Sequence, residues 1–230
     1  MTDLLRSLRP VTRLAAAVVL ALGASHSALA ANVSASGDLL QDDQIRKFKL
    51  VLDGPGSLTV TSIGYGGGTN SKGNAVPAGG FDTLLFLYSS AGVLLYQSDD
   101  GLNAVVDPST GLAADAGFTT ALLAAGMYTV AMTQYDNFPN SFELSDGFSQ
   151  SGQGNFTSAF GCSNGMFCDY EGNNRTSAWA LNFSGSTLSS VVPEPGSLAL
   201  ALAAGGALVA LRRTRRTTPS ETRQSELALG

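Results

Sequence analysis

The sequence predicts an all-β protein, a single antiparallel β-sandwich or jelly-roll domain flanked by a hydrophobic segment at each end of the chain. Three observations support this fold class. Short segments alternate apolar and polar residues, as strands do when one face packs in a core. Stretches rich in glycine, asparagine and serine separate these segments. Between residues 31 and 190 no segment joins a helical period to capping residues, although Ala114–Ala125 allows a helical turn or two.

The first thirty residues have the features of a secretory signal peptide. Three arginines precede the apolar stretch 14–23, and Ala28 and Ala30 are the small residues that a signal peptidase accepts before its cut. We therefore expect residues 1–30 to be removed and the mature chain to begin at Ala31. The domain itself is expected to span residues 31–190.

Hydrophobic alternation places the strands of this domain. Thr83–Tyr88 is apolar on both faces, which predicts a central strand covered on two sides. The turn Ser89–Gly92 then favours a hairpin with the strand that follows. The expected strands, in chain order, are Arg46–Leu52, Ser57–Ile63, Thr83–Tyr88, Val93–Tyr96, and two further segments at 128–133 and 178–183.

Three long loops connect these strands: Gly64–Gly80, Tyr135–Asn155 and Gly161–Arg175. Loops of this length in a compact domain are usually functional or disordered. The first holds seven glycines but no phosphate-binding glycine motif, so its simplest interpretation is a flexible segment. Aromatic residues in the loops could stack on sugar rings or pack against a partner, namely Tyr65, Tyr135, Phe138 and Tyr170.

The composition of the exported part excludes several function classes. Residues 31–192 contain five basic and fourteen acidic side chains, a net charge of −9, which would repel the phosphates of nucleic acids. The chain's single histidine, His26, falls within the predicted signal peptide. The mature protein therefore lacks the imidazole that Ser-His-Asp and Cys-His catalysis and most zinc sites require.

Cys162 and Cys168 are the only cysteines, and both lie on the exported side. In an oxidising compartment such a pair indicates a disulfide closing a small loop, with a stabilising effect of roughly 2 kcal/mol. A redox pair would need the tighter C-x-x-C spacing. A zinc site would be only half built from two thiols without histidine.

Acidic residues gather around the predicted hairpin. Asp82 begins one strand, and Asp99 and Asp100 follow its partner, so hairpin geometry should bring the three together. Converging carboxylates repel one another unless a cation lies among them, and calcium prefers such oxygen ligands. The candidate calcium ligands are Asp82, Asp99, Asp100, Asp107 and Asp115. The alternative is a solvated acidic face whose aspartates cap turns.

The C-terminal tail predicts a membrane segment. The apolar run Ser197–Leu211 would reach roughly 22 Å as a helix, which is short of the ~30 Å hydrocarbon core, so its span is marginal. The alternative, a buried amphipathic helix, is disfavoured because Leu198–Leu211 has no polar face. The arginines after it favour a cytoplasmic C-terminus. We expect a sorting segment at 191–216 and a cytoplasmic polar tail at 217–230.

A Pro-Glu-Pro motif, a short apolar segment and an arginine cluster together resemble the PEP-CTERM sorting tail of exported proteins from Gram-negative bacteria. The resemblance implies transient anchoring in the inner membrane, cleavage near the motif by an exosortase, and delivery to the cell surface or extracellular polymer. The residues that carry the resemblance are Val192, Pro193, Glu194, Pro195, Arg212, Arg213, Arg215 and Arg216.

A second resemblance covers about fifty residues of the body. The stretch from Phe81 to Tyr88, the segment Ala91–Leu95, Ser98–Gly101 and the strand Ala125–Val130 are similar to the bacterial pre-peptidase C-terminal domain. That family implies a jelly-roll sandwich, often with calcium, that serves as an accessory or matrix-binding module of secreted enzymes. No peptidase domain is present in this sequence, and the resemblance stops after Val130.

These inferences lead to an expected non-enzymatic surface or matrix protein, associated with extracellular polysaccharide or the cell envelope. Signal peptidase and exosortase are its expected processing partners. One alternative is a secreted glycoside hydrolase, since two carboxylates suffice for that chemistry, with candidates among Glu143, Asp146, Asp169 and Glu171. A further alternative is a calcium-stabilised structural module with no specific ligand.

Overall fold

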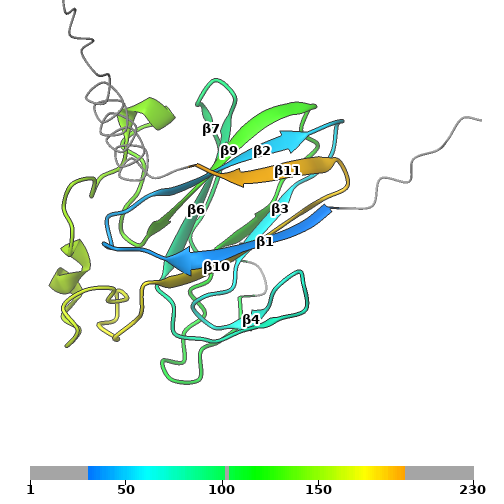
Figure 1. Ribbon diagram of the computed structural model, residues 1–230. Coiled ribbons are helices and arrows are strands. Elements are labelled where there is room, and N and C mark those ends of the chain that lie inside the picture. The colour runs from blue at the N-terminus through cyan, green and yellow to red at the C-terminus, as the bar shows by residue number, and fades with distance from the viewer. Residues whose placement is uncertain (1–30, 102–103, 195–230) are drawn as a thin grey trace, which may run out of the picture.

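The computed structural model describes residues 31–101 and 104–194 (Figure 1). The predicted signal peptide with Ala28 and Ala30 lies outside the described residues, as does the tail from Pro195 onward with its four arginines. Antiparallel strands make up almost all the regular structure of the described part, which confirms the all-β class. Two short 3-10 helices occur in this part, Leu144–Asp146 (η1) and Phe156–Phe160 (η2).

Two main sheets pack face to face (Figure 1). The first has the order β1-β10-β3-β8, formed by Ala31–Asp38 (β1), Ala178–Gly185 (β10), Thr59–Ser62 (β3) and Gly117–Thr119 (β8). The second has the order β11-β2-β9-β6-β7, formed by Leu188–Pro193 (β11), Arg46–Leu52 (β2), Gly126–Gln134 (β9), Thr83–Ser89 (β6) and Leu94–Ser98 (β7). A separate hairpin pairs Gly68–Thr69 (β4) with Ala75–Val76 (β5).

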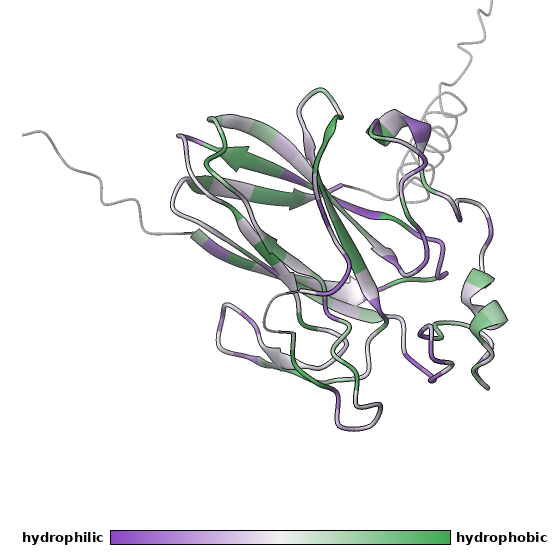
Figure 2. Cartoon of the chain, turned by 180° about the vertical axis from the view of Figure 1, so that it is seen from behind, coloured by the Kyte–Doolittle hydropathy of each residue, from purple (hydrophilic) through white to green (hydrophobic). Residues whose placement is uncertain are grey.

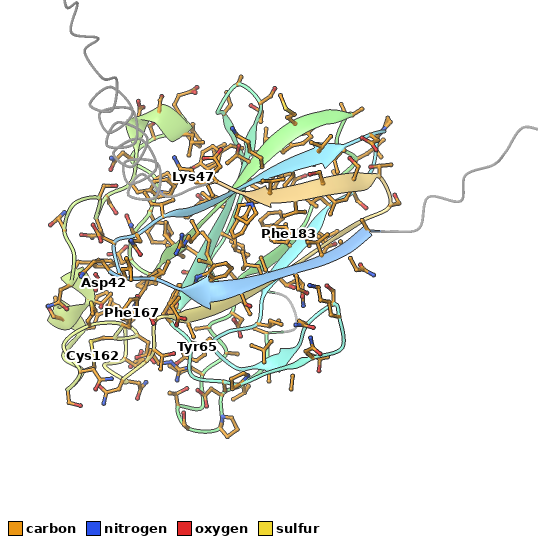
Figure 3. The ribbon with its side chains drawn as sticks, in the orientation of Figure 1. Asp42, Lys47, Tyr65, Cys162, Phe167 and Phe183 are labelled. Atoms are coloured by element: carbon orange, nitrogen blue, oxygen red, sulfur yellow. A yellow bond between two sulfur atoms is a disulfide. The ribbon has the colours of Figure 1, made fainter. Side chains whose placement is uncertain are left out.

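The main core lies between the two sheets and follows the predicted alternation. Phe48, Leu50 and Leu52 of β2 are buried there, while Lys49 between them is exposed. They face the apolar residues of β10, so that the Phe48 ring centroid lies 5.3 Å from that of Phe183. Figure 3 shows Phe183 between the sheets, and Figure 2 shows apolar and polar positions along the strands. Burial of these alternating side chains fixes the register of both sheets.

Strand β6 is buried on both faces, as the sequence predicts. Leu85 and Leu87 join the main core. Leu84, Phe86 and Tyr88 form a second apolar cluster with residues that include Phe148, from the 135–155 loop. The second cover is therefore a folded loop, and this loop is part of the core structure.

The segment Ala114–Ala125 contains a strand where the sequence allowed a helical turn. Val60 of β3 pairs with Phe118 in β8, which places Phe118 in the main core. The Ser62 N–H donates to the Ala116 carbonyl, which extends this contact. Tertiary pairing thus overrides the helical propensity of the alanines.

The two ends of the glycine-rich loop are closely packed, whereas most of residues 68–78 are exposed, so the prediction of a flexible segment does not fit the ends of the loop. A Cβ added at Gly66 would lie 1.9 Å from the Val105 carbonyl oxygen, and one added at Gly80 would lie 2.5 Å from the Ala178 carbonyl oxygen. Both glycines are needed because the backbone of another segment occupies the space of a side chain. The β4-β5 hairpin also forms within this loop.

Candidate functional site

The carboxylate of Asp115 organises the start of the glycine-rich loop. It accepts hydrogen bonds from Ser62 Oγ at 2.7 Å and from the backbone N–H groups of Gly64, Tyr65 and Gly66 at 2.8–3.0 Å. Its side chain is 2% exposed. This predicted calcium ligand therefore has protein donors on both oxygens, the turn-capping role that was the alternative for these aspartates.

Asp107, another predicted calcium ligand, forms a buried ion pair. Its Oδ2 lies 2.7 Å from Arg175 Nη1, and its Oδ1 accepts from the backbone and hydroxyl of Ser109. Burial alone would raise the pKa of Asp107, but the bonds from Ser109 and Arg175 bring it below its usual value. The structure thus places Asp107 and Asp115 in structural contacts of the loops.

Arg175 and Tyr65 complete this buried network. The guanidinium lies 3.7 Å above the Tyr65 ring and donates to the carbonyls of Gly80 and Tyr65. The Tyr65 hydroxyl donates to Asp169 Oδ2 at 2.6 Å, and burial raises the pKa of this phenol. Tyr65 is fully buried, so its expected role as an exposed ring for sugars is wrong.

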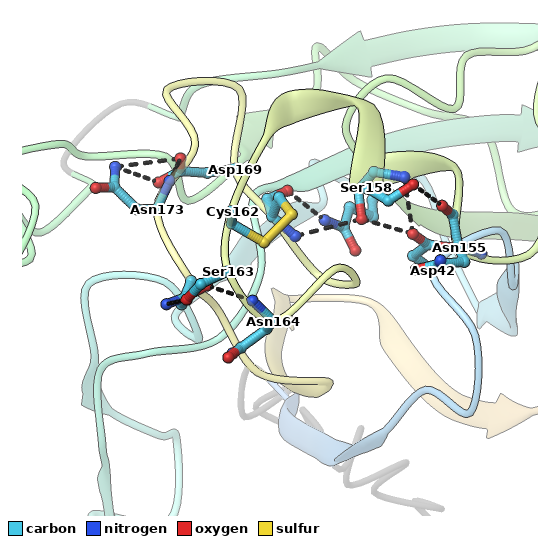
Figure 4. Close-up of a disulfide and its surroundings, with 12 residues drawn as sticks. Asp42, Asn155, Ser158, Cys162, Ser163, Asn164, Asp169 and Asn173 are labelled. Atoms are coloured by element: carbon cyan, nitrogen blue, oxygen red, sulfur yellow. Dashed lines mark hydrogen bonds between the residues drawn. A yellow bond between two sulfur atoms is a disulfide. The ribbon is translucent and has the colours of Figure 1, made fainter.

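The cysteines form the predicted disulfide, Cys162–Cys168, at one end of the sandwich (Figure 4). The backbone around it is tied to the sheets: the Cys168 carbonyl accepts from Gln134 Nε2 of β9 at 2.8 Å. The neighbouring turn is held by Asp42, which accepts from three backbone N–H groups at the start of η2 (Asn155, Phe156 and Thr157). Hydrogen bonds to β9 and to Asp42 therefore hold this end of the molecule against the rest of the domain.

The three other predicted ligands lie around the β6-β7 hairpin. Leu85 pairs with Ser98, so the residue before β6 and those after β7 approach one another. Burial, followed by the charges of Asp99, Asp100, Asp169 and Asp115, raises the pKa of Asp82 to about 8. Burial, followed by Asp100 and Asp136, also raises the pKa of Asp99. The charges of Asp99 and Asp100 thus act on Asp82, so the three carboxylates converge as the hairpin predicts.

A cavity of about 170 Å³ opens beside these carboxylates, and we call it the Asp82 pocket. It is lined by Asp82, Asp100, Leu112, Ala113, Ala114, Asp169, Tyr170 and Glu171. Asp82 is 9% exposed, and its Oδ1 atom finds no hydrogen-bond donor among the described residues. The pocket therefore contains one buried carboxyl oxygen with no partner in that part of the chain.

An aromatic cluster adjoins the Asp82 pocket through Tyr170, which lines it. The Tyr170 ring centroid lies 5.7 Å from that of Tyr135 and 5.6 Å from that of Phe160, and Phe138 packs on Tyr135. Tyr170 is 64% exposed. Three of the four aromatic residues singled out from the loops thus meet in this cluster, and Phe160 joins them. Phe160 lies in η2, between two of the loops considered in the sequence analysis, so it was not singled out there.

The hydrolase candidates divide between two places. Asp169 and Glu171 line the Asp82 pocket. Glu143 and Asp146 lie at η1, where Glu143 forms an isolated bridge with Val93 and Asp146 accepts from Ser141 Oγ. Only the first pair adjoins a carboxyl group with a strongly raised pKa, that of Asp82.

In residues 31–101 and 104–194, no three side chains of His, Cys, Asp or Glu are arranged to hold a metal ion. Calcium consequently stays a prediction. The residues best placed for it are Asp82 and Asp100, because Asp107 and Asp115 are engaged elsewhere.

Three residues of the predicted sorting motif, Val192, Pro193 and Glu194, belong to the folded domain. Val192 and Pro193 pair with Lys49 and Phe48 at the end of the edge strand β11. The Glu194 N–H donates to the Lys47 carbonyl at 2.9 Å, and its carboxylate lies 3.3 Å from Lys49 Nζ. The domain thus runs four residues past the expected boundary at 190. Among the described residues, no helix is both long and apolar enough to cross a membrane.

No protein-family model matches this chain, and no curated protein sequence matches it either.

Proposed function

We propose that this chain is a non-enzymatic exported protein of the cell surface or extracellular matrix. The signal peptide directs its export, the PEP-CTERM tail anchors it transiently in the inner membrane, and an exosortase releases it. The released domain, which we assign to the jelly-roll sandwiches, associates with extracellular polysaccharide or the cell envelope. The resemblance of the tail supports the route, and the structure of the domain supports its compatibility with a cut after Glu194.

The single observation that carries this proposal is how the edge strand β11 meets the expected exosortase cleavage point. Pairing of β11 with β2 ends at Pro193, and one further backbone bond is made by Glu194. A cut after Glu194 would therefore leave the pairing between these two strands complete.

The chemistry of the domain supports an extracellular location. A disulfide persists in oxidising compartments. The excess of acidic side chains favours solubility and disfavours nucleic acids. The exposed ring of Tyr170 beside carboxylates is a suitable surface for sugars, since aromatic rings stack on sugars and carboxylates accept from hydroxyl groups.

Deletion of Pro193–Pro195 tests the proposal in the native host. We expect the deletion variant to stay in the membrane fraction while the wild-type protein is released. Because the deletion also removes the Glu194 contact with Lys49, Lys49→Ala is the matched control, and it should be released normally. Normal release of the deletion variant would contradict the proposal.

A secreted glycoside hydrolase is the second candidate, and one observation favours it. The raised pKa of Asp82, about 8, keeps a carboxyl group protonated beside Asp169 and Glu171, as a general acid requires. A panel of glycan substrates tests this candidate. Turnover that Asp82→Asn abolishes would support it, and no turnover on any substrate would exclude it for that panel.

The calcium-stabilised module without a specific ligand rests on the same unpartnered Asp82 oxygen. A bound cation raises the apparent stability of the folded state. If calcium is the occupant, the melting temperature should rise with calcium and fall with chelator. An unchanged melting temperature would leave the carboxylates as an acidic surface only.

A further inference from the structure

The lining of the Asp82 pocket is strongly acidic. Four of its lining residues are acids, Asp82, Asp100, Asp169 and Glu171, and none is a lysine or arginine. The two ion pairs of the described residues lie elsewhere, since Arg175 binds Asp107 and Lys49 binds Glu194. Charge complementarity therefore indicates a positively charged occupant.

The buried oxygen of Asp82 is an independent sign of an occupant. Native proteins satisfy nearly all buried polar atoms, so each exception needs an explanation. Asp169, by contrast, accepts from Tyr65 and Asn173, so both of its carboxylate oxygens already have donors within the protein. Asp82 Oδ1 is thus the lining carboxyl oxygen with an unfilled need for a donor, judged on the described residues.

The shape of the site favours an organic cation over a metal ion. The described side chains offer no group of three with metal-ligating geometry. The cavity of about 170 Å³ has the volume of roughly six water molecules, at about 30 Å³ each, which suits one six-membered ring. Tyr170, 64% exposed at the rim, offers a face on which a ring or a cation can stack.

We propose that the Asp82 pocket binds a protonated amino-sugar unit of a polysaccharide. The ammonium group donates to Asp82 and Asp100, and the sugar ring stacks on Tyr170. This proposal rests on the proposed function, because it names the polymer class that the released domain would hold. An acidic pocket would reject anionic polymers and has no charged partner for N-acetylated sugars.

Isothermal titration calorimetry of the full chain with a glucosamine hexamer tests the proposal. We expect saturable binding near neutral pH, and at least tenfold weaker binding of the N-acetylglucosamine hexamer. Asp82→Asn should weaken binding of the glucosamine hexamer at least tenfold, because it removes the carboxylate that accepts from the ammonium group. Unchanged circular dichroism of this variant would show that the weaker binding is not a loss of folding.

Matched variants separate the pocket from general surface effects. Tyr170→Ala should weaken binding at least tenfold, whereas Phe142→Ala, an exposed aromatic outside the pocket lining, should not. Asp53→Asn is the corresponding carboxylate control. Absence of binding, equal binding of lysine oligomers, or Asp82-dependent binding of calcium that excludes the sugar would each overturn the proposal. Normal tail-dependent release together with any of these results would leave the proposed export route intact.

Discussion

Arg175 Nη1 lies 2.7 Å from Asp107 Oδ2, and the two side chains are 1% and 5% exposed. The same guanidinium donates to the carbonyls of Gly80 and Tyr65, so one cation joins three loops. Removing one partner of such a pair leaves an uncompensated buried charge, at a cost of about 3–5 kcal/mol. We expect Asp107→Ala to lower the free energy of unfolding by about that amount in urea denaturation.

The exposed pair between Lys49 and Glu194 is the control for this prediction. Its side chains are 66% and 30% exposed, and surface pairs contribute about 1 kcal/mol or less. Lys49→Ala should therefore have a small effect. Equal losses in Asp107→Ala and Lys49→Ala would show that the buried pair is not a structural centre.

The disulfide should stabilise the loop that delivers Phe167 to the core. Phe167 is 5% exposed, and its ring centroid lies 6.0 Å from that of Phe81. Cys162→Ser with Cys168→Ser should lower the free energy of unfolding by about 2 kcal/mol, because the closed loop is short. The measurement is urea denaturation of both proteins. Reducing agent should have a similar effect on the wild-type protein and none on the double variant; equal stability of the two proteins would refute the prediction.

Asp82 should make stability depend on pH. Its pKa rises from 3.8 to about 8 on folding, so the unfolded chain loses this proton at a lower pH than the folded protein does. The contribution of Asp82 therefore falls as pH increases from about 4 to about 8, and is constant above that window. Asp82→Asn removes the term, so the stability of this variant relative to wild type should increase across the window.

Urea titrations at several pH values compare these two proteins, with Asp53→Asn as the exposed carboxylate control. Only the variant at Asp82 should show a difference that grows with pH. A constant difference between wild type and Asp82→Asn would mean that Asp82 titrates alike in both states.

Gly66 should not accept a side chain. The Cβ of an alanine there would lie 1.9 Å from the Val105 carbonyl oxygen, so the backbone of one segment must move. Overpacking of this kind costs about 1–3 kcal/mol, and we expect Gly66→Ala to lower the melting temperature accordingly. At Gly54 an added Cβ would make only an ordinary contact, 3.4 Å from Thr187, so Gly54→Ala should change the melting temperature little. Similar melts for the two variants would contradict the packing argument.

Period-two patterns were sufficient to predict the strands that have one buried face. β2 has the expected bounds, Arg46–Leu52, because its apolar side chains alternate with lysines. β1 and β11 were not identified, since Ala31–Asp38 and Leu188–Pro193 carry few large apolar residues and are held by pairing with β10 and β2. Edge strands of this kind depend on partners that local sequence does not reveal.

The candidate site was predictable only where it follows from the hairpin. Asp82, Asp99 and Asp100 approach one another because β6 and β7 are neighbours in sequence and in space. Asp107 and Asp115 are engaged by Arg175 and by the 64–66 backbone, contacts that join distant segments and have no local pattern. The buried ion pair of Arg175 had one signal in the sequence: Arg175 is the single basic residue between Lys72 and the tail.

The first and last residues of the natural mature protein test the account most directly. We predict that protein recovered from the cell surface or extracellular matrix begins near Ala31 and ends near Glu194, as determined by mass spectrometry of its terminal peptides. Recovery of the intact chain from Met1 to Gly230 in the cytosol would contradict the account.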